Sequence, residues 1–269
     1  MVGEQPTILV EGSDGEPAEL VVEIIDGLVI LEGDMILALE EELDEWLADH
    51  GGVLPASVVI RDGWRRGRWV DAVVPYTFAD DWDDPNTAHD DNACVRHVIL
   101  QAMDEIAAVS AVRFVPRTDE RDHVNFRSGD GCSSWIGRRG YQQHVNLAYE
   151  GPTQPDLRCA KTFIVVHEIL HALGFLHEHT RDDRNENIDV LWSNIRMSMW
   201  SQYWRNPFAF DHGIYDFDSV MHYSDSAFCV RDANDDCIGP TMVAHDTSKT
   251  FGQPRDGCSK SCSASMTPR

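Results

Sequence analysis

Three histidines and one glutamate lie within eleven residues of this 269-residue chain, at His167, Glu168, His171 and His177. Residues four apart lie on one face of a helix, so His167 and His171 can direct two imidazoles at one cation, with Glu168 beside them. Gly174 permits a sharp turn that can bring His177 round as a third ligand. Three neutral histidines with one open position are typical of catalytic zinc, whereas structural zinc sites use four protein ligands rich in cysteine. We therefore expect one Zn²⁺ per chain, which activates a water molecule at neutral pH.

The segment around these histidines predicts the element that positions them. Residues 162–173 combine an apolar run with helix formers and stop at Gly174, a residue type common just past a helix end. A second long helix is expected over 91–109, where apolar residues recur at helical spacing. Short runs with strand chemistry lie at 73–78, 111–115, 123–126 and 144–148. Strands and long helices together predict one α+β domain.

Acidic residues are concentrated at the start of the chain. The net charge is −24, and residues 1–60 hold fifteen Asp or Glu and no Lys or Arg. A chain this negative repels nucleic acid and anionic membranes, so neither is an expected partner. No apolar run approaches the roughly 20 residues that a membrane-spanning helix needs, so we expect no membrane insertion. The charge changes in a glycine-containing basic cluster between Arg61 and Arg68, and we place a boundary there.

The acidic segment of residues 1–60, here called the N-terminal arm, allows two interpretations. It is a solubilising extension, or it is a propeptide whose junction with residues 61–269 is open to proteases. Apolar stretches at 20–25 and 28–31, and a helix expected over 36–47, indicate that the arm can fold against another surface. Charge and apolar pattern alone leave both interpretations open.

The run from His167 to His177 is the motif of the metzincin zinc proteases, and its continuation resembles the astacin family. Glu178 follows the third histidine, as in astacins, and the run from Ser219 to Tyr223 is similar to the astacin Met-turn. Further similar stretches lie at 68–78, 112–117 and 131–137. The resemblance implies an α+β metzincin fold, with a twisted mixed β-sheet, two long helices and a zinc cleft between an upper and a lower half. It also implies hydrolysis of peptide bonds in protein or peptide substrates.

The resemblance assigns roles to further residues. Met221 would form an apolar floor beneath the zinc, and Tyr223 would be a mobile fifth ligand that swings away to stabilise the oxyanion. Leu31-Glu32-Gly33-Asp34-Met35 looks like the family's propeptide motif, in which the aspartate ligates the zinc and displaces the catalytic water. Asp34 would then act as an aspartate switch. This likeness favours the propeptide interpretation of the arm, with residues 61–269 as the catalytic domain.

These residues predict general acid–base catalysis. Glu168 is expected to accept a proton from the attacking water and to donate it later to the leaving amine. Zinc and Tyr223 would share the oxyanion charge. An extended substrate is expected to pair with the edge of the sheet near residues 142–147. We thus expect a zinc endopeptidase made as a zymogen; the alternative is a non-catalytic zinc-binding protein of the metzincin fold that acts as a binding or inhibitory module.

Activation is expected to follow a cut in the basic cluster. An activating protease would cleave near Arg61 to Arg68, and the resemblance implies that Glu178 then contacts the new N-terminus, directly or through water. The alternative is that Glu178 is an ordinary surface residue at a helix end, without a functional role.

The seven cysteines suggest an oxidising compartment. Candidate pairs are Cys132 with Cys159, by the resemblance, Cys229 with Cys237, and Cys258 with Cys262, which leaves Cys94 odd or able to reach the C-terminal pair. Residues 1–6 lack the basic and apolar regions of a secretory signal. We expect an extracellular protein whose start is trimmed or misassigned, or which leaves the cell by another route; the alternative is an intracellular protein with reduced thiols.

Overall fold

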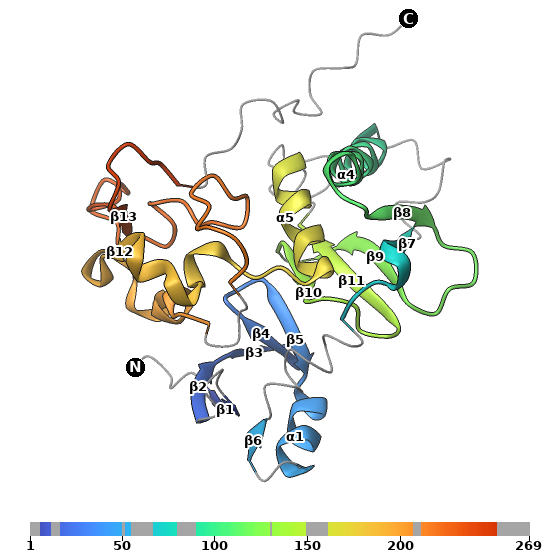
Figure 1. Cartoon of the computed structure of the whole chain (residues 1–269), viewed down its shortest axis with the longest axis horizontal. Coiled ribbons are helices and arrows are strands. Elements are labelled where there is room, and N and C mark those ends of the chain that lie inside the picture. Colours follow the sequence, from blue (N-terminus) through green and yellow to red (C-terminus); the bar gives the residue numbers. More distant parts are fainter. Residues whose placement is uncertain are drawn as a thin grey trace, which may run out of the picture. The chain divides into compact units, whose positions relative to one another are not determined.

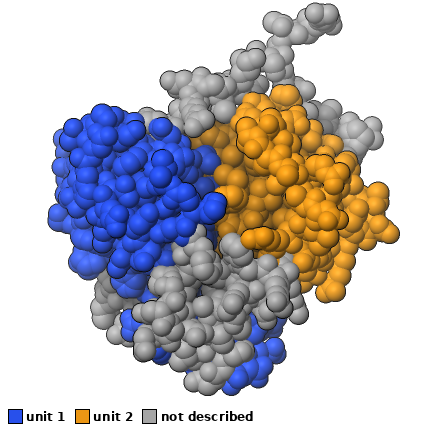
Figure 2. Space-filling model, in the orientation of Figure 1, with its two compact units in different colours: residues 1–62, 176–253 blue, residues 63–175, 254–269 orange. Residues whose placement is uncertain are grey.

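The computed structural model describes residues 6–11, 17–49, 52–54, 67–79, 90–129, 131–148, 161–206 and 211–251. The chain divides into two compact units (Figure 2). The first, here called the arm unit, comprises Met1–Asp62 and Leu176–Gln253. The second, the sheet unit, comprises Gly63–Phe175 and Pro254–Arg269. The N-terminal arm therefore belongs to the same unit as the segment that begins just before His177.

The sheet unit is built on a mixed β-sheet with the strand order β10-β11-β9-β7-β8 (Figure 1). β7 (Val73–Phe78) pairs in parallel with β8 (Arg113–Pro116) and with β9 (His123–Ser128). β9 also pairs in parallel with β11 (Gln142–Leu147), and β10 (Ser133–Trp135) is antiparallel to β11. A short 3₁₀ helix, Val70–Ala72, leads into β7.

Two long helices, α4 (Asp90–Val109) and α5 (Thr162–Leu173), pack against each other and against this sheet. Their apolar residues recur every three or four positions, so each helix buries one face. The buried core joins α4, α5 and the sheet through Val98, Ile99, Ala102, Met103, Ile106, Val124, Phe126, Val145, Leu147, Val165, Ile169 and Ala172. This core fixes α5, the helix that carries the two paired histidines.

The N-terminal arm contains a three-stranded β-sheet, an antiparallel meander of three further strands and one helix. β1 (Thr7–Glu11) is antiparallel to β2 (Pro17–Val21) and parallel to β6 (Val53–Leu54). β3 (Glu23–Ile25), β4 (Leu28–Leu31) and β5 (Met35–Leu39) form an antiparallel meander, followed by α1 (Glu40–Asp49). The turn between β4 and β5 carries Glu32, Gly33 and Asp34.

The helix expected over 36–47 is wrong at its start, because residues 36–39 belong to β5. α1 begins at Glu40, where three consecutive glutamates favour the positive end of the helix dipole. Glu42 also reaches back and accepts a hydrogen bond from the backbone N–H of Leu39 at 3.0 Å, which is one half of a capping box. These polar contacts, rather than the apolar spacing, set the helix start.

The described residues between 176 and 251, in the arm unit, contain little regular structure. β12 (Ile188–Val190) is antiparallel to β13 (Met242–Ala244). Short 3₁₀ helices span Glu178–Thr180, Asp182–Glu186, Trp192–Asn194 and Met197–Tyr203. The buried core of this part is formed by Ile188, Ile195, Tyr203, Tyr215, Met242 and Phe251.

The other element predictions are confirmed, with small shifts at their ends. The helices over 91–109 and 162–173 and the strand over 73–78 are present, and the three remaining strands lie at 113–116, 123–128 and 142–147. In the described part of the chain, none of the helices has the length and apolar character needed to cross a bilayer.

The described residues include both cysteines of one candidate disulfide and one cysteine of another. Cys229 and Cys237 are joined by a disulfide, as expected. Cys132 is disulfide-bonded, whereas Cys159, Cys258 and Cys262 lie outside the described residues. The pairing of Cys132 with Cys159 therefore stays a prediction.

Candidate metal centre

α5 presents His167 and His171 one helical turn apart. Their Nε2 atoms lie 3.0 Å apart, and the rings meet edge to face with centroids separated by 4.6 Å. The Nδ1 atom of His171 lies 2.8 Å from the carbonyl oxygen of Phe175. Because a carbonyl oxygen only accepts hydrogen bonds, Nδ1 carries the proton and Nε2 keeps its lone pair for a ligand. α5 therefore brings two imidazole nitrogens to one point.

Gly174 ends α5 with a left-handed φ angle of 104°, a conformation that glycine adopts without steric cost. Its N–H donates to the carbonyl of His171 at 2.8 Å. The indole N–H of Trp69 donates to the carbonyl of Ala172 at 2.9 Å. These contacts satisfy helix-end carbonyls and turn the chain sharply, three residues before His177.

The third histidine, His177, contacts two carboxylates of the arm unit. Its Nδ1 is 2.7 Å from Oε2 of Glu32, and its Nε2 is 3.4 Å from Oδ2 of Asp34. Both acidic residues come from the turn between β4 and β5, in which Glu32 and Gly33 have left-handed φ angles of 51° and 82°. The fold of this turn thus directs two acidic side chains at one imidazole.

Two carboxylates around one imidazole favour a positive charge between them. Burial opposes a charged ring, but Asp34 and Glu32 outweigh it and raise the pKa of His177 to about 10. Burial also raises the pKa of Glu32, against the lowering effect of its hydrogen bond to His177. A metal cation beside Nε2 can replace the proton, so metal binding and protonation compete here.

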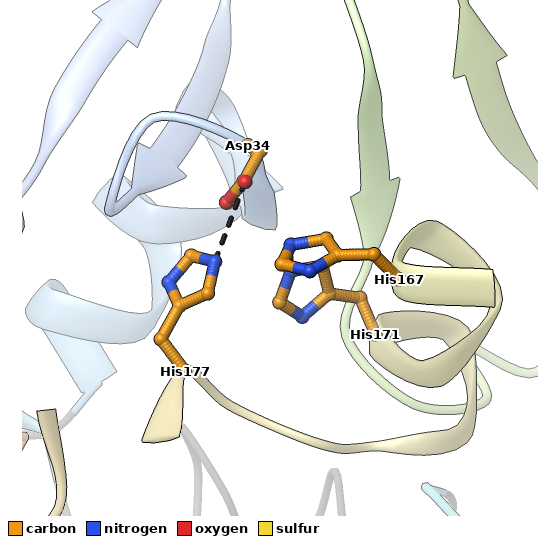
Figure 3. A group of neighbouring side chains, drawn as sticks. All are labelled: Asp34, His167, His171 and His177. Atoms are coloured by element: carbon orange, nitrogen blue, oxygen red, sulfur yellow. Dashed lines mark hydrogen bonds and ion pairs between the residues drawn. The ribbon is translucent and has the colours of Figure 1, made fainter. Parts of the chain in front are cut away.

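Asp34, His167, His171 and His177 offer four ligand atoms that all lie within 4.8 Å of one another (Figure 3). In a tetrahedral zinc site with bonds of about 2.0–2.1 Å, neighbouring ligand atoms are about 3.3 Å apart. The two nitrogens on α5 are 3.0 Å apart, and the His177 and Asp34 atoms are 3.4 Å apart. Three imidazoles and a carboxylate are also a donor set that suits zinc. The residues present therefore fit a zinc ion.

Tyr223 lies beside His177 in the arm unit, with ring centroids 4.7 Å apart. Its hydroxyl donates a hydrogen bond to the carbonyl oxygen of Glu32 at 3.0 Å. Its ring stacks on His179 at 4.0 Å, and burial lowers the pKa of His179 well below the usual value, so this ring is neutral. The hydroxyl that the resemblance assigns to the oxyanion is thus engaged by the backbone of the arm.

Met221 and Glu178 lie next to each other in the arm unit. Met221 is buried, and its carbonyl accepts a hydrogen bond from the N–H of Glu178 at 3.0 Å. The Glu178 carboxylate accepts the N–H of Asp216 at 2.9 Å and lies 3.4 Å from a guanidinium nitrogen of Arg181. Burial is the main reason that the pKa of Glu178 is raised. Arg61 to Arg66 lie outside the described residues, so the expected contact of Glu178 with a new N-terminus stays a prediction.

Glu168 is buried on α5, directly after His167, with 2% of its surface exposed.

β11, the strand that was expected to bind substrate along a free edge of the sheet, is paired on both sides. β11 has β9 on one side along its full length, and β10 pairs with it at Val145 and Asn146 on the other. The expectation of a free edge is therefore wrong for that part of the strand, because Ser133–Trp135 folds back beside it.

Sequence reasoning missed Glu32 as a candidate site residue. Its buried carboxylate and its carbonyl oxygen contact His177 and Tyr223 respectively. The available signal was an acidic residue in the otherwise apolar stretch of β4 and β5, next to Gly33 and Asp34. Because acidic residues are common in turns, that signal alone does not reveal a partner more than a hundred residues away.

Comparison with known proteins identifies the family. The peptidase family described as Astacin matches residues 63–266. The chain belongs to the astacin family. The zinc metalloproteinase nas-14 of Caenorhabditis elegans is 34% identical over 192 residues, which cover 69% of this chain and 34% of that protein. The low choriolytic enzyme of Oryzias latipes is 35% identical over 155 residues, which cover 58% of this chain and 51% of that enzyme.

A solved structure supports the astacin fold. High choriolytic enzyme 1, a hatching enzyme zinc-protease from Oryzias latipes, aligns with a TM-score of 0.57 and 27% identity, over 72% of this chain and 88% of that one. The α+β fold with a mixed sheet, expected from the sequence, is confirmed. The chain spans about a third of the length of nas-14 and about half of the length of the low choriolytic enzyme.

Proposed function

We propose that this astacin-family chain is a zinc endopeptidase made as a zymogen, in which the N-terminal arm is the inhibitory propeptide. The observation that carries the proposal is the position of Asp34, whose carboxylate oxygen lies 3.4 Å from Nε2 of His177. That nitrogen belongs to the set of ligand atoms that also includes His167 and His171. An acidic side chain of the arm beside these atoms supports the proposal, because a catalytic zinc site leaves its fourth position to water.

His167, His171 and His177 are the residues that would hold zinc, with Asp34 as a fourth ligand in the latent form. When bound, zinc supplies a Lewis acid and an activated water molecule. Glu168 takes the proton from the attacking water and returns it to the leaving amine. After the arm leaves, the Tyr223 hydroxyl donates a hydrogen bond to the developing oxyanion. Met221 forms the apolar floor of the site.

Activation in this proposal is the removal of the arm by a protease that cuts between Arg61 and Arg68. Glu178 then binds the new N-terminus. The substrates are proteins or peptides. The disulfide between Cys229 and Cys237 suits an oxidising compartment, so the enzyme acts outside the cell.

Zinc dependence of the trimmed chain tests the proposed activity. The chain is treated briefly with trypsin, the product without the arm is purified, and its new N-terminus is located by mass spectrometry. We expect hydrolysis of an internally quenched peptide, a loss of at least about 100-fold with 1,10-phenanthroline, and recovery on adding Zn²⁺ but not Mg²⁺, since zinc takes imidazole ligands and Mg²⁺ prefers oxygen. A folded, zinc-loaded product without hydrolysis would favour the non-catalytic binding protein instead.

A further inference from the structure

We infer that Glu32 is a second inhibitory carboxylate of the arm, which holds His177 through Nδ1 while Asp34 faces Nε2 of the same ring. The inference rests on the proposed function and specifies how that site is kept latent. Asp34 acts on the metal position directly. Glu32 is a positioning residue that acts through the imidazole of His177.

The contact between Glu32 and His177 has the geometry of a strong hydrogen bond. The two atoms are 2.7 Å apart, and the side chains of His177 and Glu32 are 0% and 3% exposed. A carboxylate only accepts, so Nδ1 carries a proton, and when a metal replaces the second proton on Nε2, the lone pair of that nitrogen is directed away from Glu32. Carboxylate partners of this kind fix the orientation of a metal-binding histidine and increase its basicity. Glu32 therefore prepares His177 to bind a cation.

The surroundings hold Glu32 in this position. Its φ angle of 51° is uncommon for a residue with a side chain. Its carbonyl oxygen accepts the hydroxyl of Tyr223 at 3.0 Å. A Cβ atom at position 33 would lie only 3.0 Å from Oε1 of Gln202, which explains why this position is a glycine. Gln202 is itself held in place, because its Nε2 donates a hydrogen bond to Glu23 at 3.1 Å. A strained residue persists where several contacts fix it, and such residues often lie at functional sites.

Charge explains why two carboxylates serve latency better than one. The three histidine ligands are neutral when they bind a metal, so Asp34 and Glu32 together balance the two positive charges of zinc. A buried charge is costly unless it is compensated, so this balance stabilises both the metal and the docked arm. Removing the arm withdraws both negative charges at once. It also frees the Tyr223 hydroxyl from the carbonyl of Glu32.

Zinc retention by the untrimmed chain tests the role of Glu32. We compare the wild type with Glu32→Ala, Glu32→Gln and the control Glu41→Gln, an exposed glutamate on α1, in competition with a chromophoric chelator. Glu32→Ala is expected to weaken zinc binding about 10-fold or more, because partners of metal-binding histidines contribute about 10–100-fold. Glu32→Gln keeps an acceptor without the charge and is expected to recover part of the loss. The control is expected to match the wild type.

Cobalt substitution reports on His177 itself. In the untrimmed chain loaded with Co²⁺, Glu32→Ala is expected to shift the visible absorption bands, whereas Glu41→Gln leaves them unchanged. Trypsin, whose first possible cut lies after Arg61, then removes the N-terminal arm with the substituted position from every variant, so all four chains become the same polypeptide. Their trimmed forms are expected to have identical zinc affinity, cobalt spectra and peptide hydrolysis.

The two proposals fail in different ways. Absence of hydrolysis in the common trimmed product contradicts the proposed function alone. The inference about Glu32 is overturned if both untrimmed variants retain zinc and show cobalt spectra as the wild type does. It is also overturned if both already behave as the trimmed chain, because the graded order of wild type, glutamine and alanine would then be missing.

Discussion

Replacing Glu168 with glutamine is expected to lower kcat/KM of the trimmed chain about 10²–10⁴-fold while its zinc content stays the same. Glutamine has nearly the same shape but cannot accept the proton of the attacking water or return it to the leaving amine. Glu168 is buried on α5, directly after His167, and the change to glutamine is isosteric, so it preserves the packing. The measurement is hydrolysis of a quenched peptide, with zinc counted by atomic absorption on the same sample.

The matched control is Glu186→Gln, the same chemical change at an exposed position of the Asp182–Glu186 segment. It is expected to leave kcat/KM and zinc content at the wild-type level. Activity in Glu168→Gln within about tenfold of the wild type would remove this residue from the mechanism. Loss of zinc together with activity would assign it a structural role in the metal centre.

The untrimmed chain is expected to gain activity when Asp34 is replaced by asparagine. The amide keeps the size of the side chain but carries no charge, so it binds the cation less well and competes poorly with water. Hydrogen bonds to charged groups contribute about 1.5–3 kcal/mol, which corresponds to a rise of about 10-fold or more in peptide hydrolysis before trimming. Glu32 and the Tyr223 contact still hold the arm, so activity is expected to remain below that of the trimmed chain.

Asp26→Asn is the control for this change, because Asp26 is exposed in the neighbouring turn of the arm and asparagine tolerates its left-handed φ of 52°. It is expected to stay as latent as the wild type. After trypsin treatment, the wild type and both variants become one polypeptide with one activity. An Asp34→Asn chain that is fully latent before trimming contradicts the aspartate switch.

The elements around the metal centre could be predicted because their signals are local. Two histidines four residues apart, an apolar run and Gly174 after it are sufficient to place α5 and its turn. α4 shows the same periodicity over five turns, and its bounds differ from the prediction by one residue. The short strands were placed within a few residues of their true ends, since local patterns give strand ends less precisely.

The contacts of the arm could not be predicted from local patterns. The charge of residues 1–60 distinguishes the arm from the rest of the chain, but it does not show which acidic residue is buried. Glu32 and His177 lie 145 positions apart, and only the folded arm unit brings them together. The start of α1 at Glu40 depends on a side-chain cap. The pairing of β10 with β11 likewise depends on a strand that returns beside its neighbour. Tertiary contacts decide such details.

In the proposed zymogen, the N-terminal arm alone keeps a zinc endopeptidase inactive. The most direct test follows peptide hydrolysis continuously while trypsin trims the zinc-loaded chain, with a substrate that lacks Lys and Arg so that trypsin leaves it intact. Mass spectrometry of withdrawn samples records the fraction of chains without the arm. We predict that hydrolysis rises in proportion to that fraction, and that Glu168→Gln shows the same trimming without hydrolysis. Complete trimming to a folded, zinc-loaded product that cleaves nothing above the trypsin blank would contradict the account.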